Sequence, residues 1–158
     1  MCDAHTAAVL AYALRRTSRE DAADVVAETF LVLWRRLDDV DEASALPWLY
    51  AVARRVLLAQ RRATRRQHAI AQRVAGSAPY FPEVSSGSNR LFEALAELGE
   101  KEREVLMLAA WEELSSSDAA RVVGCSATAY RIRLHRARRR LRERLDQPER
   151  LLKESPSC

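Results

Sequence analysis

Glycine is scarce in this sequence: 4 occur in 158 residues, while alanine, leucine, arginine and glutamate are abundant. Because those abundant residues favour helices and few of them favour strands, the composition indicates a helical protein. No apolar run approaches the roughly 20 residues that a membrane-spanning helix needs. The first residues also lack a basic segment followed by an apolar core, so we expect neither a secretory signal nor membrane insertion.

The chain also lacks the residue clusters that metal sites and nucleophilic enzymes need. Its cysteines, Cys2, Cys125 and Cys158, lie far apart and do not have metal-ligand spacing. An odd number of cysteines fits a reducing cytosol better than a disulfide framework. The histidines are scattered as well and form no catalytic set with these cysteines. We therefore expect a cytoplasmic protein that is not an enzyme and that uses no metal or other cofactor.

Positive charge is concentrated in two blocks, although the formal net charge is only +4. The first block contains no acidic residue and consists of Arg54, Arg55, Arg61, Arg62, Arg65, Arg66 and Arg73. In the second block only Glu143 opposes a run of arginines, namely Arg131, Arg133, Arg136, Arg138, Arg139, Arg140, Arg142 and Arg144. Two separated basic blocks indicate a polyanion that is bound at two places.

A stretch rich in proline, glycine and serine divides the chain into two modules. We interpret residues 74–89 as a flexible linker between an N-terminal module, 1–73, and a C-terminal module, 90–146, with a tail at 147–158. Neither module alternates apolar and polar residues with period two, so we predict an all-α protein. The linker composition leads us to expect that the two modules fold separately.

The N-terminal module is predicted to contain three helices. The first covers about 4–16, the second runs from an N-cap at Ser18 to Leu37, and the third carries Pro47 in its first turn. The expected inward positions of the second helix are Val25, Val26, Thr29, Leu33 and Leu37. Those of the third are Leu49, Val52, Val56 and Ala59, while Arg54, Leu58, Arg61 and Arg65 project the other way. Leu31 and Trp34 lie off the inward stripe, beside Asp24 and Glu28.

The C-terminal module ends in a pattern typical of a helix-turn-helix. A capped helix leads through Val123 to a turn at Gly124, after which Ser126 caps a long basic helix. The inward face of that helix is predicted to hold Tyr130, Leu134, Ala137, Leu141 and Leu145. The outward face holds Thr128, Arg131, Ile132, His135 and Arg139. An ordinary solvated helix is the alternative, but the turn and the arginine density favour a helix that enters the DNA major groove.

Several motifs, in a fixed order, resemble those of extracytoplasmic-function (ECF) sigma factors of the sigma-70 family. Asp24–Trp34 (DVVAETFLVLW) looks like the family's polymerase-binding helix, and Pro47–Arg54 (PWLYAVAR) like the start of its −10-recognition helix. Leu114–Ala120 (LSSSDAA), Val123–Ser126 (VGCS) and Arg133–Arg138 (RLHRAR) resemble its −35-reading helix-turn-helix. Any one match is weak, but together they cover nearly the whole chain.

The resemblance implies a sigma factor that binds core RNA polymerase and directs transcription initiation by recognising the −10 and −35 promoter elements. It assigns polymerase binding to Asp24, Glu28, Leu31 and Trp34. It assigns −10 DNA to Trp48, Arg54, Arg61, Arg62 and Arg65, although packing in the core is the more natural role for Trp48. It assigns −35 DNA to Ser126, Thr128, Arg131, Ile132, His135, Arg136 and Arg139. The implied partners are core RNA polymerase, promoter DNA and an anti-sigma protein.

The chain departs from the family pattern at several positions. Its N-terminal stretch is short, and it has Ala27 where glutamine is common, Ala59 near a common asparagine and Glu113 in place of glycine. Ile132 replaces a small polar residue. Two other functions stay open at this point. One is a helix-turn-helix regulator that does not join polymerase, and the other is an inactive sigma-like paralogue.

Overall fold

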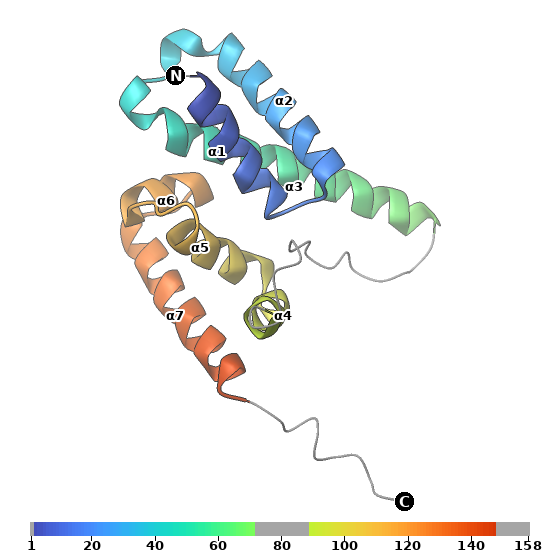
Figure 1. Ribbon diagram of the computed structural model, residues 1–158, viewed down its shortest axis with the longest axis vertical. Coiled ribbons are helices and arrows are strands. Elements are labelled where there is room, and N and C mark those ends of the chain that lie inside the picture. Colours follow the sequence, from blue (N-terminus) through green and yellow to red (C-terminus); the bar gives the residue numbers. More distant parts are fainter. Residues whose placement is uncertain (1, 72–88, 148–158) are drawn as a thin grey trace, which may run out of the picture.

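The computed structural model describes residues 2–71 and 89–147, and every regular element within these two ranges is helical. The first range contains α1 (Cys2–Leu14), α2 (Arg19–Arg35), the short 3₁₀ helices η1 (Leu37–Asp39) and η2 (Glu42–Ser44), and the long α3 (Ala45–Ala71). The second contains α4 (Asn89–Glu97), α5 (Glu100–Ala110), α6 (Ser116–Val123) and α7 (Ala127–Leu145) (Figure 1). The predicted all-α fold class is confirmed.

The helices α1, α2 and α3 pack on one another and form the first group. Ser18 is the N-cap of α2, as predicted, and its hydroxyl accepts a hydrogen bond of 3.2 Å from the Asp21 N–H. Val25 and Thr29 of α2 are fully buried. The rings of Tyr12 and Tyr50 stack with their centroids 5.0 Å apart, which ties α1 to α3.

Two predicted inward positions are wrong. Leu37 is 55% exposed because α2 ends at Arg35 and the chain continues in the 3₁₀ helix η1, which no longer follows the α-helical stripe. Ala59 is exposed as well. The buried stripe of α3 continues through Ala53 and Leu57 instead, and these side chains face the other helices.

The second group is the predicted helix-turn-helix with two helices before it. Ser115 and Ser126 cap α6 and α7, and Gly124 between them has the left-handed backbone (φ 76°) that ends α6. Tyr130 of α7 is buried, and its hydroxyl donates a 2.8 Å hydrogen bond to the Val105 carbonyl of α5. Burial raises the pKa of Tyr130 to about 12, so the phenol keeps its proton. These contacts fix the angle at which α7 leaves the turn.

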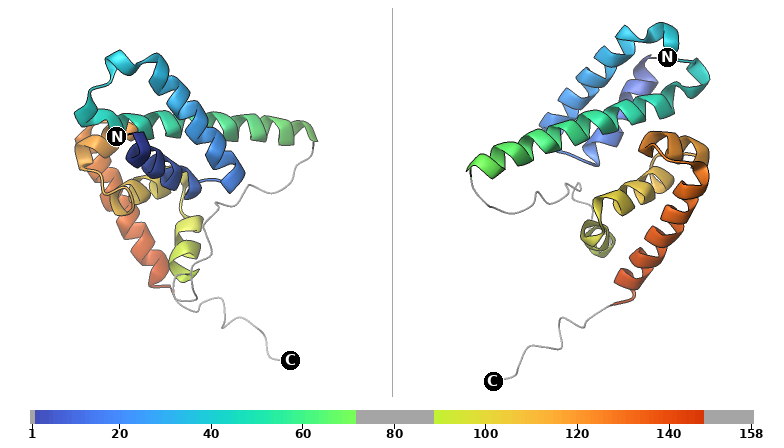
Figure 2. Two further views of the ribbon diagram at one scale, coloured as in Figure 1. Left: turned by 45° about the horizontal axis from the view of Figure 1, so that its top comes forward. Right: turned by 180° about the vertical axis from the view of Figure 1, so that it is seen from behind.

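The two groups lie against each other, a contact that the sequence analysis did not predict. That the two modules fold separately stays a prediction. Helix α6 packs on α3 (Figures 1 and 2). A single cluster of buried apolar residues extends from Val9 of α1 to Ala137 of α7. Sequence reasoning missed this packing because it joins α3 and α6, which lie far apart in the sequence. The predicted linker at 74–89 and tail at 147–158 lie outside the described residues except for their end positions, so the module boundaries stay predictions.

Glu113, where the related family commonly has glycine, adopts φ 51°. It is exposed and lies in the turn between α5 and α6. A side chain at positive φ costs roughly 1–2 kcal/mol, because Cβ approaches the following carbonyl oxygen. The turn is therefore strained at this residue.

Glu113→Gly should stabilise the protein. Relief of the strain exceeds the roughly 0.4–1 kcal/mol by which glycine stabilises the unfolded chain, so we expect Tm to rise by about 2 °C in a thermal melt. Glu113→Ala is the matched control, since it also removes the carboxylate but keeps Cβ at the same φ. Equal rises in the two variants would assign the effect to the lost charge and contradict the strain argument.

Candidate nucleic-acid interface

The outward face of α7 offers polar, basic and apolar side chains from its first three turns. All of the predicted −35 residues are exposed: Ser126, Thr128, Arg131, Ile132, His135, Arg136 and Arg139. Arg131 lies over the first turn, where its guanidinium donates a long hydrogen bond of 3.4 Å to the Thr128 hydroxyl. Ile132 is 49% exposed, although its side chain is apolar. This face can therefore offer hydrogen-bond donors and one apolar surface to a groove.

Arg139 lies about two turns further along α7 and differs from Arg131 in its surroundings. Its Nε donates to Glu143 at 3.2 Å, and the pair belongs to one helix at spacing i, i+4. Because both side chains are exposed, this ion pair contributes little and can be exchanged for another anion.

The long helix α3 carries the other basic surface. Arg62 and Arg65 are exposed, while Arg54 and Arg61 are half-buried against the second group of helices. Trp48 near the start of α3 is half-buried and packs on the apolar core. The predicted −10 residues therefore fall into two sets, one open to solvent and one facing other parts of the protein.

The outward face of α2 is apolar and acidic. Trp34 is 76% exposed and Leu31 is 55% exposed, and both lie off the buried stripe as predicted. Asp24 and Glu28 are exposed on the same helix. Large apolar side chains held in water on a regular helix are a common sign of a protein-binding surface.

Between the two groups lies an ion-pair cluster that sequence reasoning did not find. Arg16, which follows α1, is 6% exposed, and its Nε donates to Glu104 of α5 at 2.9 Å. The same guanidinium donates to both carboxylate oxygens of Glu112, at 3.2 and 3.1 Å, and Arg15 donates to Glu112 at 2.9 Å. The Tyr12 hydroxyl donates to the second oxygen of Glu104 at 2.8 Å.

The charges in this cluster stabilise one another. Burial alone would lower the pKa of Arg16, but Coulombic interaction with Tyr12, Glu104 and Glu112 outweighs it and holds that pKa above its usual value. Burial acts to raise the pKa of Glu104, yet Arg16, through its charge and its hydrogen bond, lowers it below its usual value. Burial also raises the pKa of Tyr12 well above the ordinary range, so its hydroxyl remains a donor.

The arginines of α3 extend the contact between the groups. Arg61 forms an ion pair with Glu100 of α5 and donates from its other terminal nitrogen to the Arg16 carbonyl at 2.9 Å. Arg65 lies 3.6 Å from the same Glu100 carboxylate. An opening of about 310 Å³ between the groups is lined by Arg16, Arg54, Arg61, Glu100 and Glu104, among others. The opening is therefore basic with two carboxylates inside it.

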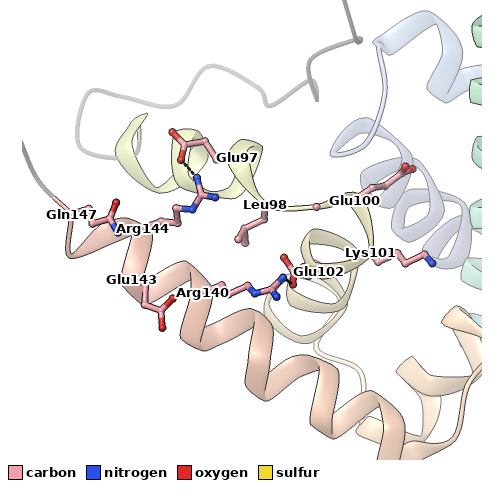
Figure 3. Close-up of a pocket in the computed structure, with 10 residues that line it drawn as sticks. Glu97, Leu98, Glu100, Lys101, Glu102, Arg140, Glu143, Arg144 and Gln147 are labelled. Carbon is pink, nitrogen blue, oxygen red and sulfur yellow. Dashed lines mark hydrogen bonds and ion pairs between the residues drawn. The ribbon is translucent and has the colours of Figure 1, made fainter. Parts of the chain in front are cut away.

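A larger cavity of about 720 Å³ lies within the second group, between α7 and the helices α4 and α5 (Figure 3). Its charges are paired across it, Arg144 with Glu97 and Arg140 with Glu102. Among residues 2–71 and 89–147, no three side chains of histidine, cysteine, aspartate or glutamate gather as metal ligands. None of the helices described is both long and apolar enough to cross a bilayer.

Both halves of the chain match a known family. The family described as Sigma-70 region 2 matches residues 1–67, which include α1 and α2 and most of α3. The family described as Sigma-70 region 4 matches residues 88–141, which include the helix-turn-helix. The two matches define a sigma-70-type, DNA-binding architecture.

The chain belongs to the ECF sigma factors and takes part in transcription initiation. It is 31% identical over 148 residues to the ECF RNA polymerase sigma factor SigL of Mycobacterium tuberculosis, which covers 89% of this chain and 84% of that protein. It is 30% identical over 139 residues to EcfG of Rhodopseudomonas palustris, covering 83% and 75% of the two chains. The resemblance inferred from the motifs is confirmed.

Two solved structures share the arrangement of most of the chain. One is the sigma factor RpoE in complex with the anti-sigma factor NepR from Bartonella quintana, with a TM-score of 0.71, 27% identity and coverage of 90% of this chain and 92% of that one. The other is CnrH in complex with the cytosolic domain of CnrY, with a TM-score of 0.57, 28% identity and coverage of 89% and 80%.

The lowered pKa of Glu104 predicts a loss of stability in acid. Because the unfolded carboxyl titrates near about 4.3, the stabilisation is complete above that value and is lost as pH falls through the lower folded pKa. The groups that face this carboxyl are Arg16, Tyr12 and Arg54. Thermal melts from about pH 7 to about pH 3 should therefore show a steeper decline in Tm than melts of Glu104→Gln. Parallel curves would contradict the assignment.

Proposed function

We propose that the protein is an active sigma factor that binds core RNA polymerase through α2, follows −10 DNA with α3 and reads the −35 element with α7. The observation that carries the proposal is the exposure of Leu31 and Trp34 on α2, beside two carboxylates. A DNA regulator that does not join polymerase has no need of such a face. Membership of the ECF family and the similarity to SigL support the same reading.

At the −35 element, the first turns of α7 enter the major groove. Ser126 and the Tyr130 hydrogen bond hold the helix so that its outward face is free. Arg131 is suited to guanine, because its fork can donate to O6 and N7 together, and Ile132 can touch a thymine methyl group. Arg136 and Arg139 contact phosphates on this proposal, and His135 lies between them and the base-reading turn.

At the −10 element, α3 tracks the phosphate backbone with Arg54, Arg61, Arg62 and Arg65. These arginines all belong to one helix, with Arg61 two turns after Arg54 and Arg65 one turn after Arg61, so that they can contact phosphates along one strand once Arg61 is free of Glu100. Trp48 supports the helix through its packing on the core and offers only its half-exposed ring to a base.

An anti-sigma protein is a further proposed partner. One solved structure that shares the arrangement of this chain is the sigma factor RpoE in complex with the anti-sigma factor NepR. Another is CnrH in complex with the cytosolic domain of CnrY. A partner of this kind would keep the sigma factor from polymerase until a signal releases it.

Leu31→Ala should weaken binding to core RNA polymerase about tenfold, since burial of a leucine side chain contributes at least about 1.5 kcal/mol. The affinity is measured by fluorescence anisotropy of the labelled full chain titrated with core enzyme. Leu37→Ala is the matched control, because Leu37 is as exposed as Leu31 but lies beyond the end of α2. Charge reversal at both Asp24 and Glu28 should also weaken binding without changing helicity by circular dichroism.

The same variants are then compared in transcription by core polymerase on genomic DNA, with the 5′ ends of the transcripts sequenced. The unaltered chain should produce discrete start sites preceded by a shared pair of elements, and Leu31→Ala should reduce them. Binding to polymerase without any start site would indicate an inactive paralogue. DNA binding without binding to polymerase would indicate a separate regulator.

Arg131→Ala should relax specificity at one base pair of the −35 element and reduce affinity for the preferred site by about 1–3 kcal/mol. Arg139→Ala should instead weaken binding to all sequences alike and lower the salt slope by about 0.9. The measurement is selection of the full chain with polymerase on a randomised −35 duplex, followed by a salt titration. An unchanged motif in Arg131→Ala with an altered one in Arg139→Ala would refute this placement of α7.

A further inference from the structure

We infer that the free chain inhibits its own binding to −10 DNA through a set of ion pairs, which we call the lock. In the lock, carboxylates of α5 and of the turn after it bind the basic face of α3 and the end of α1, so that phosphates of DNA cannot bind α3 at the same time. The inference rests on the proposed role of α3 in following −10 DNA. The lock consists of Glu100, Glu104 and Glu112 on one side and Arg15, Arg16, Arg61 and Arg65 on the other.

The inner part of the lock is buried and saturated with hydrogen bonds. The Glu112 side chain is fully buried and both of its oxygens accept from Arg16. Both oxygens of Glu104 are used as well, one by Arg16 and one by Tyr12. The remaining Arg16 contacts are its bond to the Tyr12 carbonyl at 2.9 Å and its position 3.6 Å above the Tyr12 ring.

The charge balance makes this arrangement specific to the closed form. Arg15 and Arg16 are neutralised by Glu104 and Glu112, which come from the other group of helices. If the groups separate, the first group exposes two positive charges and the second group exposes two negative charges, and water must then hydrate all four. Separation of a buried ion pair leaves charges without their partners, which is strongly unfavourable, so these pairs favour the arrangement in which the groups are together. This inner part of the lock, which we call the buried latch, therefore holds the two groups together.

The outer part of the lock occupies the residues that DNA would use. Glu100 pairs with Arg61 and lies near Arg65, two of the arginines proposed to contact phosphate. The second terminal nitrogen of Arg61 is bound to the Arg16 carbonyl. Both terminal nitrogens of Arg61 are therefore already bound, so a phosphate that binds them must displace Glu100, and the lock and the −10 backbone compete for one side chain.

The other two proposed surfaces are not engaged in this way. Arg131 and Ile132 on α7 are exposed while the groups are together, as are Leu31 and Trp34 on α2. The lock thus acts selectively on α3. It permits contact with polymerase and with the −35 element while it withholds the −10 contact.

The test uses the full chain with three changes. Glu104→Gln combined with Glu112→Gln removes the buried latch, and Glu100→Gln removes only the outer pair, whose carboxylate is half-exposed and so poses little risk to folding. Glu97→Gln is the matched control, because Glu97 forms an ion pair with Arg144 inside the second group. Circular dichroism checks that each variant is folded.

Two properties are measured at one salt concentration: the radius of gyration by small-angle X-ray scattering, and affinity for a single-stranded oligonucleotide of random sequence. The double variant should expand and bind on the order of tenfold more tightly. Glu100→Gln should bind about two- to fivefold more tightly, and Glu97→Gln should change neither property. The gains should vanish when Arg61 and Arg65 are also replaced by alanine.

The outcomes separate the lock from the function on which it rests. Expansion of the double variant without tighter binding by either lock variant would overturn the lock as an inhibitor. If Arg61→Ala with Arg65→Ala also fails to weaken the open form, the proposed −10 role of α3 falls too. Unchanged size and affinity in both lock variants would overturn the lock alone, provided that the same arginine changes still weaken DNA binding.

Discussion

The guanidinium of Arg16 lies where water scarcely reaches it, and the rest of the arrangement follows from the need to neutralise it there. Its partners, Glu104 and Glu112, come from the second group of helices, so the charge is satisfied only while the groups are together. The Arg16 carbonyl in turn accepts from Arg61, which connects the same residue to the basic helix. One residue, through its side chain and its carbonyl, thus links the end of α1, the turn before α6 and the basic helix α3.

The features that could be predicted from the sequence are those that depend on neighbours. Ser18 and Ser126 cap their helices by bonding to N–H groups three residues on, and Gly124 supplies the left-handed turn. Periodicity likewise placed Tyr130 and Leu134 inside and Trp34 outside. The pairing of Arg16 with Glu104 spans 88 positions, and no local pattern distinguishes these residues from other surface charges. Leu37 and Ala59 were misplaced because the stripe was extended past the point where the helical packing changes.

In the candidate site, too, the sequence predicted the side chains that belong to one regular face of a helix, but not those whose position depends on distant residues. The residues of α7 and α2 lie as the helical pattern indicated, because each face belongs to one regular element. The arginines of α3 do not form one surface, since Arg61 turns toward Glu100 while Arg62 stays in solvent. An unbroken run of arginines in the sequence therefore overestimates the charge that is available to a ligand. How much of it is available depends on carboxylates from a distant part of the chain.

The open face of α2 has a consequence for the order of binding events. Leu31 and Trp34 are in solvent while the helix groups are together, so a large partner can dock there without any prior rearrangement. The encounter rate is then set by diffusion and by the acidic residues beside them, as for a preformed surface. On the proposed function, separation of the two groups would follow as an isomerisation of the bound complex. Association at α2 should therefore be fast and second-order, and commitment to a promoter first-order.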